Sequence, residues 1–370
     1  MASWDVGGDF TRFIYLNASE FWTTSQLQAG PRVRPLADAA SERVASLPIS
    51  IGGRATTLDA YVQAAPLDGV IVIDDGRVFY ESYPRMHRED RHLWFSVSKT
   101  LVSLSVGLLE ERGLIDVSQP VSRYLPRLVG SVWQDISVID ILDMASGVAC
   151  PEVLSAAESC FWTFFDALGW PVADAATEDP WTELTTMEPG RPAGTLHEYT
   201  SVNTELLQWL VEEVSGQRYA DFVEQEIWQH VGAGSDGLLV STPNGHAMTA
   251  GGMTSTLRDL ARYGMLYIDG SVVSDVHRDK ILNDGRPELI GPQSFQGRIL
   301  GPGVTRHSTW QWDVVTVDGD FYKSGHGGQG LYVSPSQGLV IAWFGTHSEN
   351  GRPNGFQLAA RQLAESGLMR

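Results

Sequence analysis

The sequence predicts an α/β (α+β) fold in which an antiparallel sheet, built from both ends of the chain, is flanked by helices and carries a helical insertion. Strand patterns occur near residues 69–83 and return over 310–345, whereas the stretch between about 115 and 245 contains only helical and loop signals. Strands at both ends around a helical middle indicate one sheet whose two parts meet in space. The expected domains are a sheet domain of residues 1–115 and 246–370 and a mainly helical domain of residues 116–245, with the functional site in the cleft between them.

The first third of the chain predicts a hairpin followed by a helix. Asp74-Asp75-Gly76 is a hairpin-turn signal between two apolar runs, and Gly113 is typical of a residue that ends a helix. The expected elements are an irregular arm over residues 1–67 with one helix near Leu36–Leu47, strands over Gly69–Ile73 and Arg77–Tyr83, and a helix over Ser98–Arg112.

The remaining two thirds predict helices first and strands afterwards. Asp318-Gly319-Asp320 and Ser334–Gly338 have turn composition and separate the last strands. The expected helices cover Asn203–Val214, Tyr219–His230, Thr256–Leu266 and Gln357–Ser366. The expected strands cover Asp313–Val317, Phe321–Lys323, Gly330–Val333 and Leu339–Phe344.

Composition excludes several classes of function. The net charge of −19 argues against nucleic acid and anionic membrane surfaces as partners, because binding to phosphate needs clustered Lys and Arg. No window approaches 18 consecutive apolar residues, so we expect no transmembrane span. The first eleven residues lack the basic and apolar segments of an export signal, which favours a cytoplasmic protein. The sequence leaves the oligomeric state open, a homodimer included.

The two cysteines and nine histidines do not form a recognisable framework. Cys150 and Cys160 are expected to be free thiols in a cytoplasm, with pairing across ten residues as the alternative. The chain has no CxxC, HExxH or His-rich cluster. We therefore expect neither a metal site nor a cofactor.

Lysine is rare in this chain, with three residues against 23 arginines. One of them closes Ser96-Val97-Ser98-Lys99, whose i, i+3 spacing puts the hydroxyl of Ser96 and the amine of Lys99 on one helical face. A buried lysine can lose its proton and act as a base, which arginine cannot do. The S-x-x-K pattern alone is also compatible with a serine that caps a helix beside a surface lysine.

Two later motifs have residue types suited to the same chemistry. Tyr199 precedes a predicted helix, and its phenol could relay a proton to a leaving group; the alternative is a plain helix start capped by Ser201 or Asn203. Lys323-Ser324-Gly325 is followed by His326-Gly327-Gly328. These glycines would let a strand approach a substrate closely, so that the N–H of His326 points at a carbonyl oxygen, although a glycine-rich edge strand or bulge has the same pattern.

The order and separation of the three motifs resemble those of the penicillin-recognising serine hydrolases. A tyrosine in the second motif is similar to the class C β-lactamase side of that superfamily. Longer segments resemble its 6-aminohexanoate-dimer (nylon-oligomer) hydrolase and family VIII-type carboxylesterase branch; they are 96–126, 199–219, 251–264 and 326–335. The resemblance covers about residues 80–355 and implies a β-lactamase/transpeptidase-like fold.

The resemblance also implies catalytic roles. Ser96 would be the acylated nucleophile, Lys99 its base and Tyr199 the proton relay, with the backbone N–H groups of Ser96 and His326 as the oxyanion hole. Ser201 would occupy the position where class C enzymes have Asn.

The Lys323-Ser324-Gly325 motif is expected to bind substrate. If Lys323 points inward, it would hold Lys99 neutral or meet a substrate carboxylate. The nylon-oligomer branch does not keep K-T-G at this place, which makes the assignment of Lys323 the least direct one.

The segment between Ser146 and Leu196 is aromatic and acidic, and in the resembling family it covers the cleft. The nylon-oligomer branch uses a tyrosine and an acid there to hold the amine end of its substrate. Counting without gaps places Leu154 and Phe165 at those two positions, although a slip of one residue would substitute Asp166. We therefore expect Leu154, Phe165, Asp166 and Trp170 to contact substrate.

The absence of an acid at the counted position favours an apolar acyl or alcohol group. The expected activity is a serine hydrolase that acts on a small carboxylic ester through an acyl-enzyme intermediate. The alternatives are an amidase on linear amides such as 6-aminohexanoate oligomers, an acyltransferase, and a non-catalytic penicillin-binding-like sensor domain.

Overall fold

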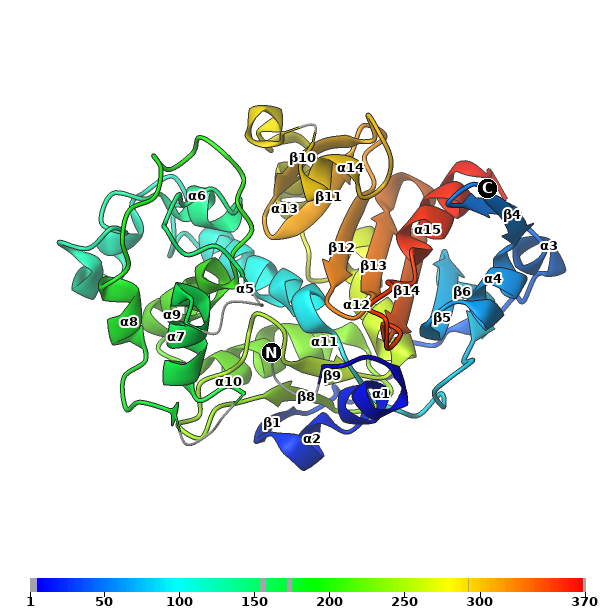
Figure 1. Ribbon diagram of the computed structural model, residues 1–370, viewed down its shortest axis with the longest axis horizontal. Coiled ribbons are helices and arrows are strands. Elements are labelled where there is room, and N and C mark those ends of the chain that lie inside the picture. The colour runs from blue at the N-terminus through cyan, green and yellow to red at the C-terminus, as the bar shows by residue number, and fades with distance from the viewer. Residues whose placement is uncertain (1–4, 154–157, 172–174, 292, 369–370) are drawn as a thin grey trace.

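The computed structural model describes residues 5–153, 158–171, 175–291 and 293–368. Its main sheet has the strand order β10-β11-β12-β13-β14-β5-β6-β2 (Figure 1). The pairs are antiparallel except for β2 and β6, which are parallel. The strands span Thr305–Thr309 (β10), Trp312–Thr316 (β11), Phe321–Gly325 (β12), Gln329–Ser334 (β13), Leu339–Gly345 (β14), Leu67–Asp74 (β5), Arg77–Ser82 (β6) and Ala37–Asp38 (β2).

Strands from both ends of the chain meet in this sheet, as predicted. β14 lies beside β5 with Val340 opposite Ile73, and β5 forms the predicted hairpin with β6. Side chains alternate between two cores: Ile71 and Ile73 belong to the larger one, whereas Val70 and Val72 belong to a smaller core on the other face. Because both faces are covered, the central residues of β5 and most of β14 are apolar, as in Val70–Ile73 and Leu339–Phe344.

Helices cover the two faces of the main sheet. α12 (Leu257–Asp269) packs on β13, β14 and β5 on the side of the larger core. α15 (Phe356–Glu365) and α4 (Leu58–Ala64) contribute to the smaller core on the opposite face (Figure 1). Near the β10 end lie α13 (Asp275–Asn283), η6 (Pro287–Leu289) and α14 (Phe295–Arg298), and η7 (Pro335–Gln337) connects β13 to β14.

The helical part of the chain lies on the other side of the molecule (Figure 1). Its centre is the packing of α5 (Lys99–Glu111) against α9 (Ser201–Ser215), both predicted to within a few residues. The other elements are η2 (Val121–Arg123), η3 (Pro126–Leu128), α6 (Val138–Leu142), α7 (Cys160–Leu168), α8 (Trp181–Thr185), α10 (Tyr219–Val223), the π-turn η5 (Glu224–Trp228) and α11 (Gln229–Val231). The division of the chain at 115 and 245 stays a prediction.

A second sheet lies beneath the start of α5. Its order is β1-β8-β9-β7, with bounds Thr24–Leu27 (β1), Gly237–Val240 (β8), Met253–Ser255 (β9) and His92–Leu93 (β7). β7 leads directly into η1 (Phe95–Ser98) and then α5, so this sheet fixes the place where the S-x-x-K motif begins.

The predicted irregular arm over residues 1–67 is wrong. The described part of this region contains α1 (Gly8–Leu16), α2 (Ala18–Phe21), α3 (Glu42–Ala45) and the hairpin of β3 (Pro48–Ile51) with β4 (Arg54–Thr57), besides β1, β2 and α4. The helix expected near Leu36–Leu47 is shorter in the structure and covers only α3. The middle of the chain also contains a strand, β8, where only helices and loops were expected.

The expectation of free thiols is wrong as well, because Cys150 and Cys160 form a disulfide. Their Cα atoms are 5.4 Å apart, a normal separation for this bond, and Cys160 is the first residue of α7. The ten-residue separation in sequence did not by itself distinguish the two alternatives.

The described helices include none with both the length and the apolar character needed to cross a membrane.

Candidate active site

Ser96 lies in a tight turn between a strand and a helix. It belongs to η1, and Phe95 before it has a positive φ of 45°, which is uncommon for a residue other than glycine. The end of β12 packs against this turn: a Cβ on Gly325 would come within 2.5 Å of the Trp94 carbonyl oxygen. Gly325 therefore permits close contact between the third motif and the backbone just before Ser96.

Lys99 is fully buried beside Ser96. Its Nζ atom lies 3.1 Å from Ser96 Oγ and donates a 2.7 Å hydrogen bond to the Ala250 carbonyl. Burial lowers the pKa of Lys99 to about 8, an effect that Glu152 opposes and Lys323 reinforces. About a tenth of this amine is neutral at pH 7, and the neutral form is the one that can act as a base for the Ser96 hydroxyl.

Glu205 holds the loop that positions Lys99. Its carboxylate accepts hydrogen bonds from the Thr249 hydroxyl at 2.7 Å and from the Ala250 N–H at 2.8 Å. Burial raises the pKa of Glu205 to about 7. Sequence reasoning placed this residue only in a helix, although an acid directly before the apolar run of α9 was an available signal.

Tyr199 lies two residues before the start of α9, with its ring between two lysines. The ring centroid is 5.2 Å from Lys99 Nζ and 4.8 Å from Lys323 Nζ. Burial raises the pKa of Tyr199 well above its usual value, as does the nearby charge of Glu152, while a hydrogen bond with Ser96 acts in the other direction. The phenol thus stays protonated at neutral pH and can donate.

Lys323 points inward, but its charge is already paired. Its Nζ atom is 2.6 Å from Asp313 Oδ1 in a fully buried ion pair, and Asp313 also accepts from the N–H and the hydroxyl of Ser324 at 2.9 and 2.5 Å. Lys323 was expected either to keep Lys99 neutral or to bind a substrate carboxylate. Its buried position agrees with the first role, because its charge lowers the pKa of Lys99. A substrate carboxylate could bind Lys323 only by competing with the carboxylate of Asp313. The sequence did not indicate Asp313 as the partner of Lys323.

His326 follows β12 and is held from the N-terminal segment. Its Nε2 atom lies 2.5 Å from Asp5 Oδ2, and Tyr15 donates a 2.7 Å hydrogen bond to the other oxygen of Asp5. The imidazole also meets the ring of Phe95 edge-on at 5.5 Å. Because residues 1–67 were expected to be irregular, the contribution of Asp5 and Tyr15 was missed.

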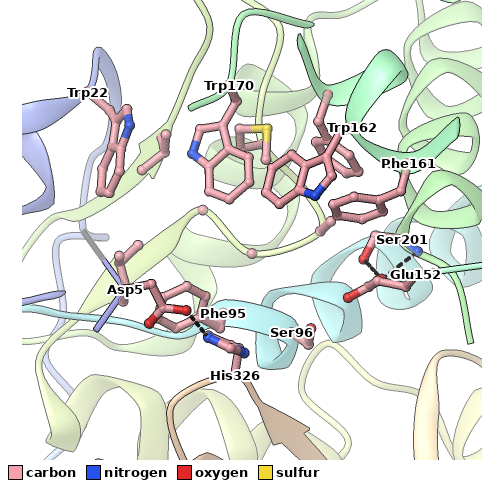
Figure 2. Close-up of a pocket in the computed structure, with 17 residues that line it drawn as sticks. Asp5, Trp22, Phe95, Ser96, Glu152, Phe161, Trp162, Trp170, Ser201 and His326 are labelled. Carbon is pink, nitrogen blue, oxygen red and sulfur yellow. Dashed lines mark hydrogen bonds and ion pairs between the residues drawn. The ribbon is translucent and has the colours of Figure 1, made fainter. Parts of the chain in front are cut away.

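A cavity of about 110 Å³ opens beside Ser96. Figure 2 shows Trp22, Trp170 and Trp162 along one wall, with Ser96 opposite them and the carboxylates of Asp5 and Glu152 towards the two ends. A larger cleft of about 1040 Å³, which Tyr199 and Ser324 line, shares Ser96 with this cavity. Ser96 thus lies where an aromatic pocket meets a wider, more polar cleft.

Glu152, like Asp5, is an acid in the lining of this pocket, and the sequence count missed it. Its Oε2 atom accepts hydrogen bonds from the N–H and the hydroxyl of Ser201 at 3.0 and 2.5 Å, so that it caps the start of α9. The expected cap by Ser201 or Asn203 is wrong, since the N-cap is Thr200, which makes no side-chain cap hydrogen bond. Leu154, which the count placed at this subsite, lies outside the described residues.

The other residues counted for the substrate site divide into two groups. Phe165 and Trp170 line the aromatic cavity beside Ser96, and their contact with substrate stays a prediction. Asp166 is half-buried on α7 and is absent from the described lining of both cavities. Among the described residues of this segment, the acid that lines both cavities is therefore Glu152.

Known proteins are similar to this chain in sequence and in fold. The family described as Beta-lactamase matches residues 55–365. The 6-aminohexanoate-dimer hydrolase of Paenarthrobacter ureafaciens is 31% identical over 300 residues, which cover 79% of this chain and 76% of that protein.

Solved structures agree in fold. A Bacillus anthracis protein that bears the name 6-aminohexanoate-dimer hydrolase superimposes with a TM-score of 0.80 at 21% identity, covering 98% of this chain and 94% of that one. EstCE1, described as a hydrolase with promiscuous acyltransferase activity, superimposes with a TM-score of 0.66 at 15% identity, covering 82% and 95%.

Proposed function

The chain belongs to the beta-lactamase family, whose fold is that of serine hydrolases, and on this premise we propose that it cleaves a small carboxylic ester through an acyl-enzyme at Ser96. The observation that carries the proposal is the buried Lys99 amine, 3.1 Å from Ser96 Oγ, with its pKa lowered to about 8. A base that is partly neutral, within hydrogen-bond reach of a hydroxyl, is the requirement for activating a serine nucleophile.

The proposed reaction proceeds in two halves. Ser96 Oγ attacks the ester carbonyl carbon while Lys99 takes its proton, and the backbone N–H groups of Ser96 and His326 stabilise the developing oxyanion. Tyr199 gives its proton to the departing alkoxide and recovers one from Lys99, so the first product is an alcohol. Water then attacks the acyl-enzyme by the reverse proton path and releases the acid.

The pocket supports a substrate with an apolar group. Phe161, Phe165 and Trp170 present ring surface within the cavity that contains Ser96. Such walls stabilise an acyl or alcohol group by burial of apolar surface, about 25 cal/mol per Å². We assign this cavity to the apolar part of the ester.

Glu152 favours a second candidate, an amidase for linear amides that carry a free amine. Its carboxylate lies in the same cavity as Ser96, so an ammonium group could find there the acid that the sequence count did not supply. A charge-assisted hydrogen bond of this kind contributes about 1.5–3 kcal/mol. One of the relatives is named for hydrolysis of 6-aminohexanoate dimer, which is such a substrate.

Two measurements test the proposal. A covalent serine inhibitor should add to the peptide that contains Ser96, and Ser96→Ala should lose both the adduct and turnover. Ser98→Ala is the matched control, because that hydroxyl lies in the same turn and accepts from the Met253 N–H instead. An adduct elsewhere, or an active Ser96→Ala enzyme, would refute the assignment.

A comparison of kcat/KM values distinguishes the ester hydrolase from the amidase. The substrates are p-nitrophenyl acyl esters of increasing chain length and 6-aminohexanoate dimer. The leading proposal expects the short esters to be far better substrates. Glu152→Gln should change their turnover little above about pH 9, where Lys99 is largely neutral with or without the charge of Glu152. Efficient dimer hydrolysis that Glu152→Gln abolishes would instead establish the amidase.

A further inference from the structure

Two histidines and an aspartate from three distant parts of the chain converge beside the cleft. Asp5 precedes α1, His326 lies in the turn between β12 and β13, and His347 follows β14. Their potential ligand atoms all lie within 4.8 Å of one another. His326 Nε2 is 2.5 Å from Asp5 Oδ2, and His347 Nε2 is 3.6 Å from Asp5 Oδ1.

We propose that Asp5, His326 and His347 bind a divalent transition-metal ion of the Zn²⁺ type. Two imidazole nitrogens and one carboxylate oxygen are ligands that Zn²⁺ accepts, whereas Ca²⁺ and Mg²⁺ prefer oxygen alone. Tetrahedral bonds of about 2.0–2.2 Å separate the ligand atoms by roughly 3.3–3.6 Å. His326 Nε2 lies 2.5 Å from one oxygen of Asp5, closer than that range, and His347 Nε2 lies 3.6 Å from the other oxygen, at its upper end. Side-chain shifts of about 1 Å would bring both nitrogens and one carboxylate oxygen to these separations.

The surroundings of the three side chains suit such a site. Tyr15 donates a hydrogen bond of 2.7 Å to Asp5, which orients the carboxylate as outer-shell partners of metal ligands do. The side chains of Asp5 and His347 are 16% and 14% exposed, and that of His326 is 39% exposed. The cluster is therefore held in place by its neighbours yet remains open to an ion from the cleft.

His326 and Asp5 contact each other directly through a hydrogen bond. A bound Zn²⁺ would replace that contact and connect the N-terminal segment to the β12–β13 turn more firmly. No local sequence motif could indicate this cluster, because more than 300 positions separate Asp5 from His326 in the sequence.

Occupation of the site should inhibit hydrolysis, an inference that rests on the proposed function. The three ligands line the same cleft as Ser96 and Tyr199. With three protein ligands, a tetrahedral ion keeps one position for water, which would lie within that cleft. The ion and its water would therefore occupy space next to the proposed oxyanion hole that the substrate needs.

Calorimetric titration of the full chain with ZnCl₂ tests the binding. We expect one saturable site in the parent and in Ser96→Ala, and a loss of affinity of at least tenfold in both Asp5→Asn and His347→Gln. Asp9→Asn and His230→Gln are matched controls, because both side chains are exposed and lie outside the cluster; they should bind as the parent does. Absence of saturable binding, or equal binding by all variants, would overturn the site.

Ester hydrolysis tests the consequence. Zn²⁺ should inhibit the parent, EDTA should restore it, and His347→Gln should keep its turnover while losing the inhibition. Thermal unfolding by circular dichroism verifies that this variant is folded, and Asp5→Asn gives an independent measurement of binding. Specific binding by a chain that hydrolyses nothing would refute the proposed function and leave the metal site, whereas specific binding without inhibition would refute its role in regulation.

Discussion

At the scale of single residues, the chemistry depends on how each ionisable group is buried. Lys99 and Lys323 are both fully buried, yet only Lys323 has a carboxylate within ion-pair distance, Asp313 at 2.6 Å. Lys99 instead donates to a backbone carbonyl and faces Ser96. Burial without a directly paired charge is the condition that lowers the pKa of a lysine. The two residues therefore differ in role although both belong to motifs.

The first prediction concerns the pH dependence of Lys99. Its pKa is lowered to about 8 and its neutral form is the active one, so kcat/KM should rise with pH, reach half its maximum near pH 8, and fall about tenfold by pH 7. Lys99→Arg should be nearly inactive because arginine stays charged. Lys280→Arg is the matched control, since Lys280 pairs with Glu110 outside the site. A Lys99→Arg enzyme with parental turnover would exclude this base.

The second prediction concerns Tyr199. Tyr199→Phe removes the phenol but keeps the ring near both lysines, so the chemical step should slow by about 10²–10⁴-fold with little change in thermal stability. The loss should be larger for an amide than for a p-nitrophenyl ester, because p-nitrophenol leaves without protonation. Equal losses on both substrates, measured as kcat, would show that Tyr199 positions the substrate and does not protonate it.

Sequence reasoning identified the candidate catalytic residues but not their partners. Ser96, Lys99 and Tyr199 occur in motifs whose order could be compared with a family. Glu152 and Asp5 carry no such pattern, because each reaches the site through contacts between distant parts of the chain: Glu152 with Ser201, and Asp5 with His326. Only the three-dimensional structure shows that Glu152 and Asp5 lie at the site.

At the scale of elements, long strands that pair with a neighbour in sequence were predicted, whereas short strands that pair with a distant segment were missed. The hairpin of β5 and β6 was predicted because a turn signal lies between two strands of at least six residues each. β8 was missed because it has four residues and pairs with β1, with Thr24 opposite Val240, more than 200 positions away. A strand that short has too few residues for a period of two to be distinguished from a buried helix segment.

The third prediction concerns the contact between β11 and β12. Asp313 on β11 accepts from Lys323 and Ser324 on β12, all within the buried sheet. Asp313→Asn should destabilise the protein by about 3–5 kcal/mol, because it leaves the Lys323 charge buried and unpaired. The double variant Asp313→Asn, Lys323→Met should recover much of that loss. Urea unfolding measures both, and a single variant as stable as the parent would contradict the inferred ion pair.

At the scale of the whole molecule, one sheet joins both ends of the chain and places the motifs around one cleft. β14 pairs with β5, and β12 packs against the turn that carries Ser96, so the first and third motifs meet although they are more than 200 positions apart. Helix α9 places Tyr199 against them from the helical side. The fold could be predicted because strand patterns lie at both ends, whereas the N-terminal segment could not, because its elements are short and depend on this framework.

The last prediction concerns the net charge of −19, which surrounds a site whose pocket itself contains Asp5 and Glu152. An acidic protein concentrates cations near its surface, and salt reduces that effect because the Debye length falls from about 10 Å at 0.1 M to about 3 Å at 1 M. For three p-nitrophenyl esters of equal size, kcat/KM should fall with added NaCl for the cationic ester, rise for the anionic one and change little for the neutral one. KCl should give the same result, which excludes a specific effect of sodium.

Glu152→Gln separates the field of the whole molecule from the contact inside the pocket. A contact at hydrogen-bond distance is screened much less than a distant surface charge, so any preference for the cationic ester that survives at 1 M salt should come from the pocket. Glu152→Gln should therefore reduce the preference for the cationic ester that remains at 1 M salt. The dependence of kcat/KM on salt concentration should stay nearly unchanged, because the substitution removes one negative charge from a net charge of −19. If the variant removed the salt dependence and left the high-salt preference intact, Glu152 would act through the general field and the pocket would not hold a cation.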